Sequence, residues 1–193
     1  SAVTSLPEDA LWPRASHWIG QPLVGPVDVA VLGVPAWRTS ISPTGAHATP
    51  AAIRQALQRY STFASEHGVD LGDLTAADAG DVEEPDFAEG EARVVGRVRA
   101  VSGQSRLLVA LGGDNSITHS VALGVWGDGI GAAGLVTLDA HHDLRDGVSN
   151  GSPVRRLVEA GLPGPQVVQI GIADFANSRA YRKRAREWGI TVI

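Results

Sequence analysis

The chain has 193 residues, of which 44% are hydrophobic and 19% charged, and it contains no cysteine. The length suits one ordinary domain, and the lack of cysteine excludes disulfide frameworks, zinc sites with thiolate ligands and thiol nucleophiles. Sixteen basic against 21 acidic side chains give a formal net charge of −5, which argues against a nucleic-acid partner. No apolar run approaches the roughly 20 residues of a membrane span, so we expect a soluble, cytoplasmic protein without a membrane partner.

The first part of the chain predicts an arm, a strand and a helix. Residues 1–26 are rich in proline and tryptophan and show no clean period, so we expect an irregular arm that lies over the domain. Residues 27–34 form a nearly continuous β-branched apolar run, typical of a strand covered on both faces. Thr49 and Pro50 predict the N-cap and first turn of a helix over residues 51–64. The expected helical face carries Ile53, Leu57 and Tyr60.

The rest of the chain alternates between strand and helix patterns. Apolar runs predict strands at residues 74–82, 106–111, 134–140, 166–172 and 190–193. Helices are predicted around Val94, Val98 and Val101 and over residues 117–125, 153–160 and 178–188. The alternation indicates one α/β domain over residues 27–193 with a mainly parallel sheet. The last strand has the composition of a buried strand with nothing after it to cover it, so we expect a chain truncated at its C-terminus.

Polar side chains gather directly after three of the predicted strands. Residues 35–40, 112–116 and 139–146 each follow an apolar strand run, and the last two loops are dense in acidic, amide and imidazole groups. In open α/β sheets, ligands collect outside the carboxyl ends of the strands. We therefore expect these three loops to converge on one rim of the sheet.

The pattern Asp139-x-His141-x-Asp143 is the strongest candidate site. Alternate residues of an extended segment point the same way, so two carboxylates and one imidazole can face a single point. Such a donor set suits Mn²⁺ or a related divalent ion, and a carboxylate at a strand end can bridge two ions that activate one water. The alternative is that Asp139 caps the next turn and His141 is an ordinary loop histidine.

Other residues near these loops have predicted roles of their own. Gly112 and Gly113 lack the spacing and the lysine of a phosphate loop, and we expect them to allow a close backbone approach while Asp114 orients a neighbouring ligand. Arg145 is suited to hold a substrate carboxylate. Ser152 is either a helix cap or part of a substrate loop.

The remaining basic side chains are expected to have no part in the site. Arg155 and Arg156 are expected to lie on a solvated helix face. Five histidines are expected at the surface or in packing, with the last of them pointing away from its neighbours: His17, His47, His67, His119 and His142.

Two segments together resemble a known family. LDAHHDLRDG (residues 138–147) and LGGDNSIT (residues 111–118) resemble the manganese ureohydrolases, the family that contains arginase, agmatinase and formimidoylglutamase. The resemblance extends over nearly the whole chain from Val31 onward. SNGSPVRRL (residues 149–157) and QIGIADFANSRAY (residues 169–181) are most similar to the bacterial formimidoylglutamases. The resemblance implies a three-layer α/β/α sandwich, usually assembled into trimers or hexamers.

The resemblance also implies a binuclear manganese site. Asp139, His141 and Asp143 would be ligands, with Asp139 bridging two Mn²⁺ ions and Asp143 orienting the attacking water. Asn115 stands where most members have a histidine ligand, so its amide oxygen would bind more weakly or leave the place to water. The family also has a later S-x-D-x-D-x-x-D-P segment with two further ligands, and no such segment occurs before Ile193. The chain is therefore expected to carry only part of the active site.

The implied reaction is hydrolysis of N-formimidoyl-L-glutamate to L-glutamate and formamide in histidine degradation. Arg145 would contact the amino-acid end of this substrate, and Asn150 stands where agmatinase-like relatives carry a histidine. Two alternatives remain open. One is a guanidino hydrolase of the agmatinase or guanidinobutyrase type, and the other is a metal-poor family member with a structural or regulatory role.

Overall fold

The strands form two separate parallel sheets in the computed structural model, which describes residues 6–193. The first sheet has the order β4-β1-β5, and its strands are Ala76–Asp81, Val27–Val34 and Ser105–Gly112. The second has the order β6-β7-β8, and its strands are Leu135–Leu138, Val167–Ile170 and Thr191–Val192. The expected mainly parallel α/β architecture is confirmed, but over the described residues β5 and β6 do not pair.

Helices lie between the strands along the chain. The α-helices are α1 (Ala15–Ile19), α2 (Thr49–Ala56), α3 (Phe87–Ser102), α4 (Ile117–Trp126), α5 (Pro153–Glu159) and α6 (Arg179–Glu187). Short 3₁₀ segments are η1 (Ala46–Ala48), η2 (Leu57–Arg59), η3 (Leu71–Asp73), η4 (Gly127–Ala132) and η5 (Gly164–Gln166). None of these helices combines the length and the apolar composition that crossing a bilayer requires.

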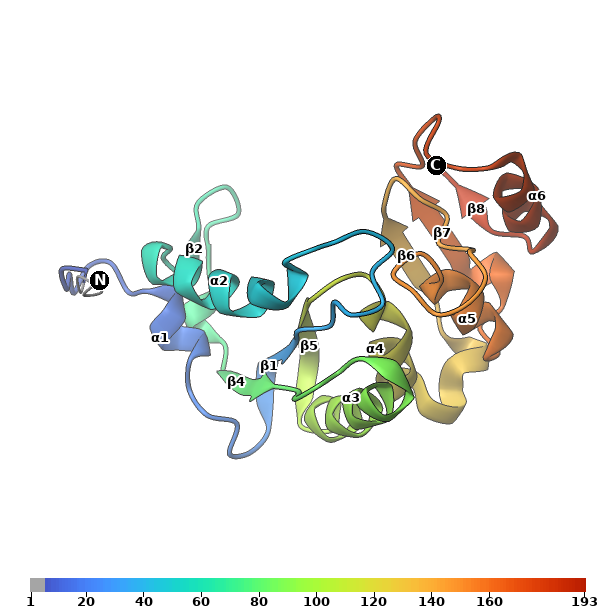
Figure 1. The fold of residues 1–193 in the computed structure, drawn as a ribbon. Helices are drawn as coiled ribbons and strands as arrows, with labels where there is room; N and C mark the ends of the chain where they lie inside the picture. Colours follow the sequence, from blue (N-terminus) through green and yellow to red (C-terminus); the bar gives the residue numbers. More distant parts are fainter. Residues whose placement is uncertain (1–5) are drawn as a thin grey trace.

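Two hydrophobic cores meet at helix α4. Leu32 and Val34 of β1 pack with Val94 and Val98 of α3 in the first core, and Ile117 at the start of α4 contacts this cluster. The second core lies around α5, β7 and α6. Its buried members are Ala122, Leu144, Val154, Leu157, Leu162, Val167, Ala185 and Ile190. Figure 1 shows α4 between α3 and α5, so this helix connects the first sheet to the second.

The predicted helix over residues 51–64 is wrong in its second half. Helix α2 ends at Ala56, and after η2 the chain is extended at Tyr60, which is 62% exposed. The N-terminal arm causes this, because the N–H of Ala15 bonds to the carbonyl of Tyr60 at 2.8 Å. Three residues after Tyr60, β2 (Phe63–Ala64) begins, and it forms an antiparallel hairpin with β3 (Val69–Asp70). Tertiary pairing thus overrides the helical pattern.

Three further predictions of local structure need correction. Thr49 lies inside the first turn of α2, and the residue before it makes no side-chain cap. Ser152 makes no cap on α5, since its hydroxyl bonds to the backbone of Ser149 instead. The final strand was predicted as buried, but Val192 is 47% exposed because β8 is the edge of its sheet and pairs with β7 alone among the described strands.

Part of the N-terminal arm has regular contacts. Its first five residues lie outside the described residues, and the remainder contains α1. The indole of Trp18 donates to the carbonyl of Leu74 at 2.8 Å, and the N–H of Asp78 in β4 donates to Gln21 at 2.8 Å. The arm therefore runs along the outer edge of the first sheet (Figure 1).

Candidate metal centre

The loops that follow β1, β5, β6 and β7 surround one cavity of about 640 Å³. Six of the seven predicted site residues line it: Asn115, Asp139, His141, Asp143, Arg145 and Asn150. They come from segments separated by up to 35 residues, and the parallel strands bring their loops to one edge, as the strand-end rule expects. The seventh residue, Asp114, lies beside the cavity rather than in its lining.

Asp139 contacts His141 directly, and Asn115 lies between the carboxylates of Asp139 and Asp143. Oδ1 of Asp139 accepts the N–H of His141 at 2.8 Å and lies 3.2 Å from the Nδ1 atom of its ring. Nδ2 of Asn115 donates to Oδ2 of Asp143 at 2.5 Å and lies 3.4 Å from Oδ2 of Asp139. Asp139 therefore makes the turn contact that the alternative interpretation expects, while its second oxygen faces Asn115 and Asp143.

The electrostatics of Asp143 are unfavourable without a nearby cation. This side chain is buried, with 6% of the residue exposed, and its backbone has a φ of 55° in the left-handed region. Burial and, after it, the charge of Asp139 together raise the pKa of Asp143 to about 7, against the lowering effect of the hydrogen bond from Asn115. A divalent cation between the two carboxylates would remove this penalty.

The available donors fit a manganese ion by their chemistry. Two carboxylates and an imidazole are donors that such an ion accepts. Among residues 6–193, however, no three His, Asp or Glu side chains are already arranged around a single point. The ring of His141 bonds to Asp139, and the His141 side chain is 59% exposed. The ring must therefore rotate to bind the same ion as the two carboxylates.

Asn115 acts here as a donor and not as an oxygen ligand. Its Oδ1 accepts the hydroxyl of Thr118 at 2.8 Å, and its NH₂ group faces the carboxylates of Asp139 and Asp143. In this orientation the amide stabilises the carboxylates as anions and supplies no electron pair to a metal. The expectation that Asn115 binds metal more weakly than the usual histidine, or leaves its place to water, stays a prediction.

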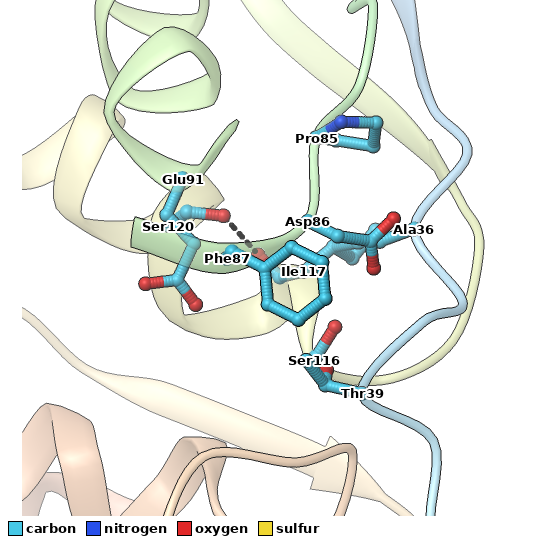
Figure 2. A pocket seen from close by; sticks show the side chains of 9 residues that line it. All are labelled: Ala36, Thr39, Pro85, Asp86, Phe87, Glu91, Ser116, Ile117 and Ser120. Carbon is cyan, nitrogen blue, oxygen red and sulfur yellow. Dashed lines mark hydrogen bonds between the residues drawn. The ribbon is translucent and has the colours of Figure 1, made fainter. Parts of the chain in front are cut away.

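The loop after β1 is fixed to the rest of the site by carboxylates. Asp86 accepts the N–H groups of Trp37 and Arg38 at 2.9 Å each, and Figure 2 shows its carboxylate beside Ala36. Gly113 approaches this loop so closely that a Cβ atom there would lie 2.4 Å from the carbonyl oxygen of Val34. The predicted close backbone approach is therefore present, and it joins the loop after β5 to the loop after β1.

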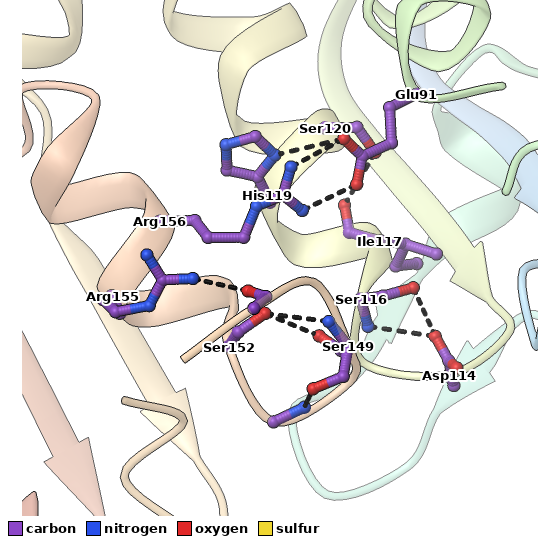
Figure 3. Close-up of polar contacts among 12 residues, drawn as sticks. Glu91, Asp114, Ser116, Ile117, His119, Ser120, Ser149, Ser152, Arg155 and Arg156 are labelled. Atoms are coloured by element: carbon purple, nitrogen blue, oxygen red, sulfur yellow. Dashed lines mark hydrogen bonds and ion pairs between the residues drawn. The ribbon is translucent and has the colours of Figure 1, made fainter. Parts of the chain in front are cut away.

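Asp114 completes this connection between the loops. Its carboxylate accepts the N–H and hydroxyl of Ser116 at 3.0 and 2.5 Å, as Figure 3 shows, and the hydroxyl of Ser40 bonds to the other oxygen. The expected contact with a metal-ligating side chain is not among these bonds. Asp114 instead holds Ser40 and the start of α4, and it acts on the site through the backbone.

Arg145 and Asn150 face the cavity from the loop before α5. The Arg145 guanidinium makes no hydrogen bond or ion pair within the described part of the chain, and Gly151 leaves room for its stem, because a Cβ there would lie 2.7 Å from Cδ of Arg145. Oδ1 of Asn150 accepts the N–H of Ile41 at 3.1 Å. Arg145 is thus available to a substrate anion, while Asn150 also fastens the loop after β1.

The prediction of a solvated basic face on α5 is wrong. The Arg156 side chain is 15% exposed and makes two bonds to Glu91 of α3, at 2.6 and 2.7 Å. Arg155 donates to the carbonyls of Arg145 at 2.7 Å and Gly147 at 2.5 Å. Both arginines are therefore structural, and Arg155 supports the backbone of the loop that carries Arg145.

The loop after β7 contributes side chains to the cavity that the sequence patterns did not predict. Phe175, Asn177 and Tyr181 line the cavity, as does Ser42 from the loop after β1. The sequence ADFANS (residues 173–178) follows the predicted strand at its carboxyl end. Applied to this fourth strand, the strand-end rule would have placed the loop at the site.

Comparison with known proteins identifies the family. The family model described as the arginase family matches residues 27–193. The chain belongs to the arginase family. Its arginase-like α/β fold and the resemblance seen in the sequence are thereby confirmed.

Individual members of the arginase family are similar over most of this chain. The formimidoylglutamase of Halalkalibacterium halodurans is 36% identical over 184 residues, which cover 91% of this chain and 56% of the relative. The crystal structure of formimidoylglutamase from Bacillus subtilis has a TM-score of 0.90 at 28% identity and covers 100% of this chain and 63% of that chain. Trypanosoma cruzi formiminoglutamase with Mn²⁺ has a TM-score of 0.77 at 25% identity, over 86% of this chain and 59% of its own. The chain thus spans little more than half the length of these relatives.

Proposed function

We propose that this chain is part of a manganese-dependent enzyme that hydrolyses N-formimidoyl-L-glutamate to L-glutamate and formamide. The observation that carries the proposal is the meeting of Asp139, His141 and Asp143 with the cation of Arg145 in one cavity. The similarity to formimidoylglutamases supports the choice of substrate. A glutamate-derived substrate carries two carboxylates, for which an arginine with no internal partner is suited.

The chain's own residues divide the work of binding and catalysis. Asp139, His141 and Asp143 would hold the manganese of the complete enzyme, for which we propose two ions. Such ions, when bound, lower the pKa of water so that hydroxide forms at neutral pH. Asp143 accepts a hydrogen bond from the attacking water and orients it toward the amidine carbon. Asn115 keeps Oδ2 of Asp143 in place through its own N–H.

The amine that leaves must gain a proton as the C–N bond breaks. Water adds its oxygen to the amidine carbon, formamide is released, and the nitrogen of glutamate takes up the proton. Asn150 cannot serve as the proton carrier, because an amide does not titrate and its Oδ1 is occupied by Ile41. Solvent in the open cavity can supply this proton. Asn150 contributes to substrate binding through its position at the cavity wall.

The proposed reaction also implies a setting for the enzyme. Formimidoylglutamate hydrolysis belongs to histidine degradation, which we place in the cytoplasm. The family resemblance favours a homo-oligomer, a trimer or a hexamer, and the small amidine substrate is the expected partner of the site.

The test of the proposal uses the full-length protein loaded with Mn²⁺. We expect release of formamide and glutamate from N-formimidoyl-L-glutamate, measured by chromatography of the products, and loss of turnover when a chelator removes the metal. Urea release from agmatine or guanidinobutyrate, with no formamide from formimidoylglutamate, would assign the chain to the guanidino hydrolases instead.

Metal analysis separates both enzymes from a metal-poor family member. A catalytic centre retains stoichiometric Mn²⁺, and tight binding to the folded state raises the melting temperature. A full-length protein that holds no manganese and melts at the same temperature with and without it would have a structural or regulatory role.

A further inference from the structure

The amide side chains of Gln169 and Asn177 hold the backbone between the expected metal ligands. Oδ1 of Asn177 accepts the N–H of His142 at 2.9 Å, and Nδ2 of Asn177 donates to the carbonyls of Ala140 at 2.8 Å and Ala173 at 3.3 Å. Gln169 of β7 is fully buried and bonds to both the ring and the carbonyl of His142. Ala140 and His142 alternate with the ligands, so these bonds hold the ligand segment at the positions between its ligands, with Asn177 in the cavity lining and Gln169 outside it.

The hydrogen bonds of Gln169 fix the orientation of both partners. A backbone carbonyl can only accept, so the Nε2 group of Gln169 must face the His142 carbonyl at 2.9 Å. The oxygen Oε1 then faces Nδ1 of His142 at 2.7 Å, which requires that Nδ1 carries a proton. Each of these four atoms therefore has one compatible role, as hydrogen-bond donor or as acceptor. The buried His142 ring, 2% exposed, is thereby locked onto β7.

The ligand segment needs such support because it has little regular structure of its own. Within the described residues, the backbone of the ligand segment after β6 makes two hydrogen bonds to β7 and the loop that follows β7. The N–H of Asp139 donates to the carbonyl of Ile170 at 3.1 Å, and the N–H of Ala173 donates to the carbonyl of Ala140 at 3.0 Å. Beyond Ala140 the side chains of Gln169 and Asn177 make the contacts, and Asp143 occupies the left-handed region at a φ of 55°. A non-glycine residue there is strained unless its surroundings hold it.

We propose that Gln169 and Asn177 are positioning residues that set the Mn²⁺ affinity of Asp139, His141 and Asp143 by fixing the backbone between them. The inference rests on the proposed function, since it concerns the same metal centre. Residues that hold metal ligands in this way typically change metal affinity by about 10- to 100-fold when they are mutated. Gln169 lies outside the cavity lining, so its effect must pass through His142.

The experiment is a Mn²⁺ titration of the full-length, metal-free protein, with free Mn²⁺ followed by electron paramagnetic resonance. We expect Gln169→Leu to weaken Mn²⁺ binding about 10- to 100-fold, because leucine fills similar space without either hydrogen bond. Gln166→Leu is the matched control, since Gln166 is exposed at the opposite end of β7 and its side chain makes no hydrogen bond in the described chain. Asn177→Ala provides a second variant in a loop, in case Gln169→Leu does not fold.

The outcomes separate this inference from the proposed function. Variants that melt at a lower temperature without metal but bind Mn²⁺ as tightly as the wild type would show a purely structural role and overturn the inference. A wild type that binds no Mn²⁺ overturns it together with the metal centre. A wild type that binds Mn²⁺ but releases no formamide overturns the proposed substrate alone, and weakened binding in Gln169→Leu then still supports the positioning role.

Discussion

His119 of α4 is enclosed between charged groups of the neighbouring helices (Figure 3). Its side chain is 12% exposed, and its Nδ1 atom lies 3.8 Å from a carboxylate oxygen of Glu91 without a hydrogen-bond partner. Burial and, after it, the charges of Arg156 and Arg155 together lower the pKa of His119 to about 4, against the opposing effect of Glu91. The folded protein therefore favours the neutral imidazole, because burial disfavours a charged ring and both carboxylate oxygens of Glu91 already bond to Arg156.

This histidine should make stability depend on pH. The folded-state pKa lies below the unfolded value of about 6.5, so its contribution is fully present above pH 6.5 and is lost as the pH falls toward 4. The limit for one proton is about 1.4 kcal/mol per pH unit. We expect His119→Gln to flatten the fall in the free energy of unfolding between pH 6.5 and 4.5, measured by urea titration. His67→Gln, at an exposed site, should leave the slope unchanged. Parallel curves for wild type and His119→Gln would contradict the prediction.

At the scale of elements, the packing of α4 on α3 depends on a glycine. A Cβ atom on Gly124 would lie 2.7 Å from Cβ and Cγ1 of Val98, which is fully buried in the first core. Gly96, two residues before Val98 in α3, is exposed and has nothing within 4 Å of its Cβ position. One glycine is therefore required by contact between two helices, while the other only adds freedom to the unfolded chain.

Alanine substitutions at these two positions should have opposite effects. Gly124→Ala should lower the free energy of unfolding by about 1–3 kcal/mol, because the methyl group forces α4 away from α3. Gly96→Ala should raise it by about 0.5–1 kcal/mol, since alanine costs less backbone entropy in a helix. Chemical denaturation of both variants tests this. Two shifts of the same sign would show that α3 and α4 do not pack as described.

At the scale of the whole molecule, the two parallel sheets leave strand edges unpaired in the described part of the chain, among them one edge each of β5 and β6. β5 pairs with β1 and β6 with β7, and neither strand has a second partner within residues 6–193. Both also expose apolar side chains, with Leu107 55% and Val136 59% exposed. Exposed apolar edge strands of this kind are templates for pairing with other chains.

A polypeptide limited to residues 1–193 should therefore self-associate. We expect light scattering to rise with its concentration, and the pair of substitutions Leu107→Lys and Val136→Lys to reduce this, because charged side chains on an edge oppose strand pairing. Leu11→Lys is the control, since Leu11 is 93% exposed but lies in the arm outside both sheets. An equal reduction by this control would attribute the association to general hydrophobicity.

The sequence by itself determined the strands of the two parallel sheets, most helices and the pattern of candidate ligands. Apolar runs and the alternation of Asp139, His141 and Asp143 are local features, and the strand-end rule converts them into a place on the sheet. The tertiary structure alone decided where α2 ends, because the arm pairs with Tyr60. It also decided which polar side chains support the site. Gln169 reaches His142 across 27 residues, and Arg156 reaches Glu91 across 65. Local patterns carry no information about such contacts, because they form only when distant elements pack together.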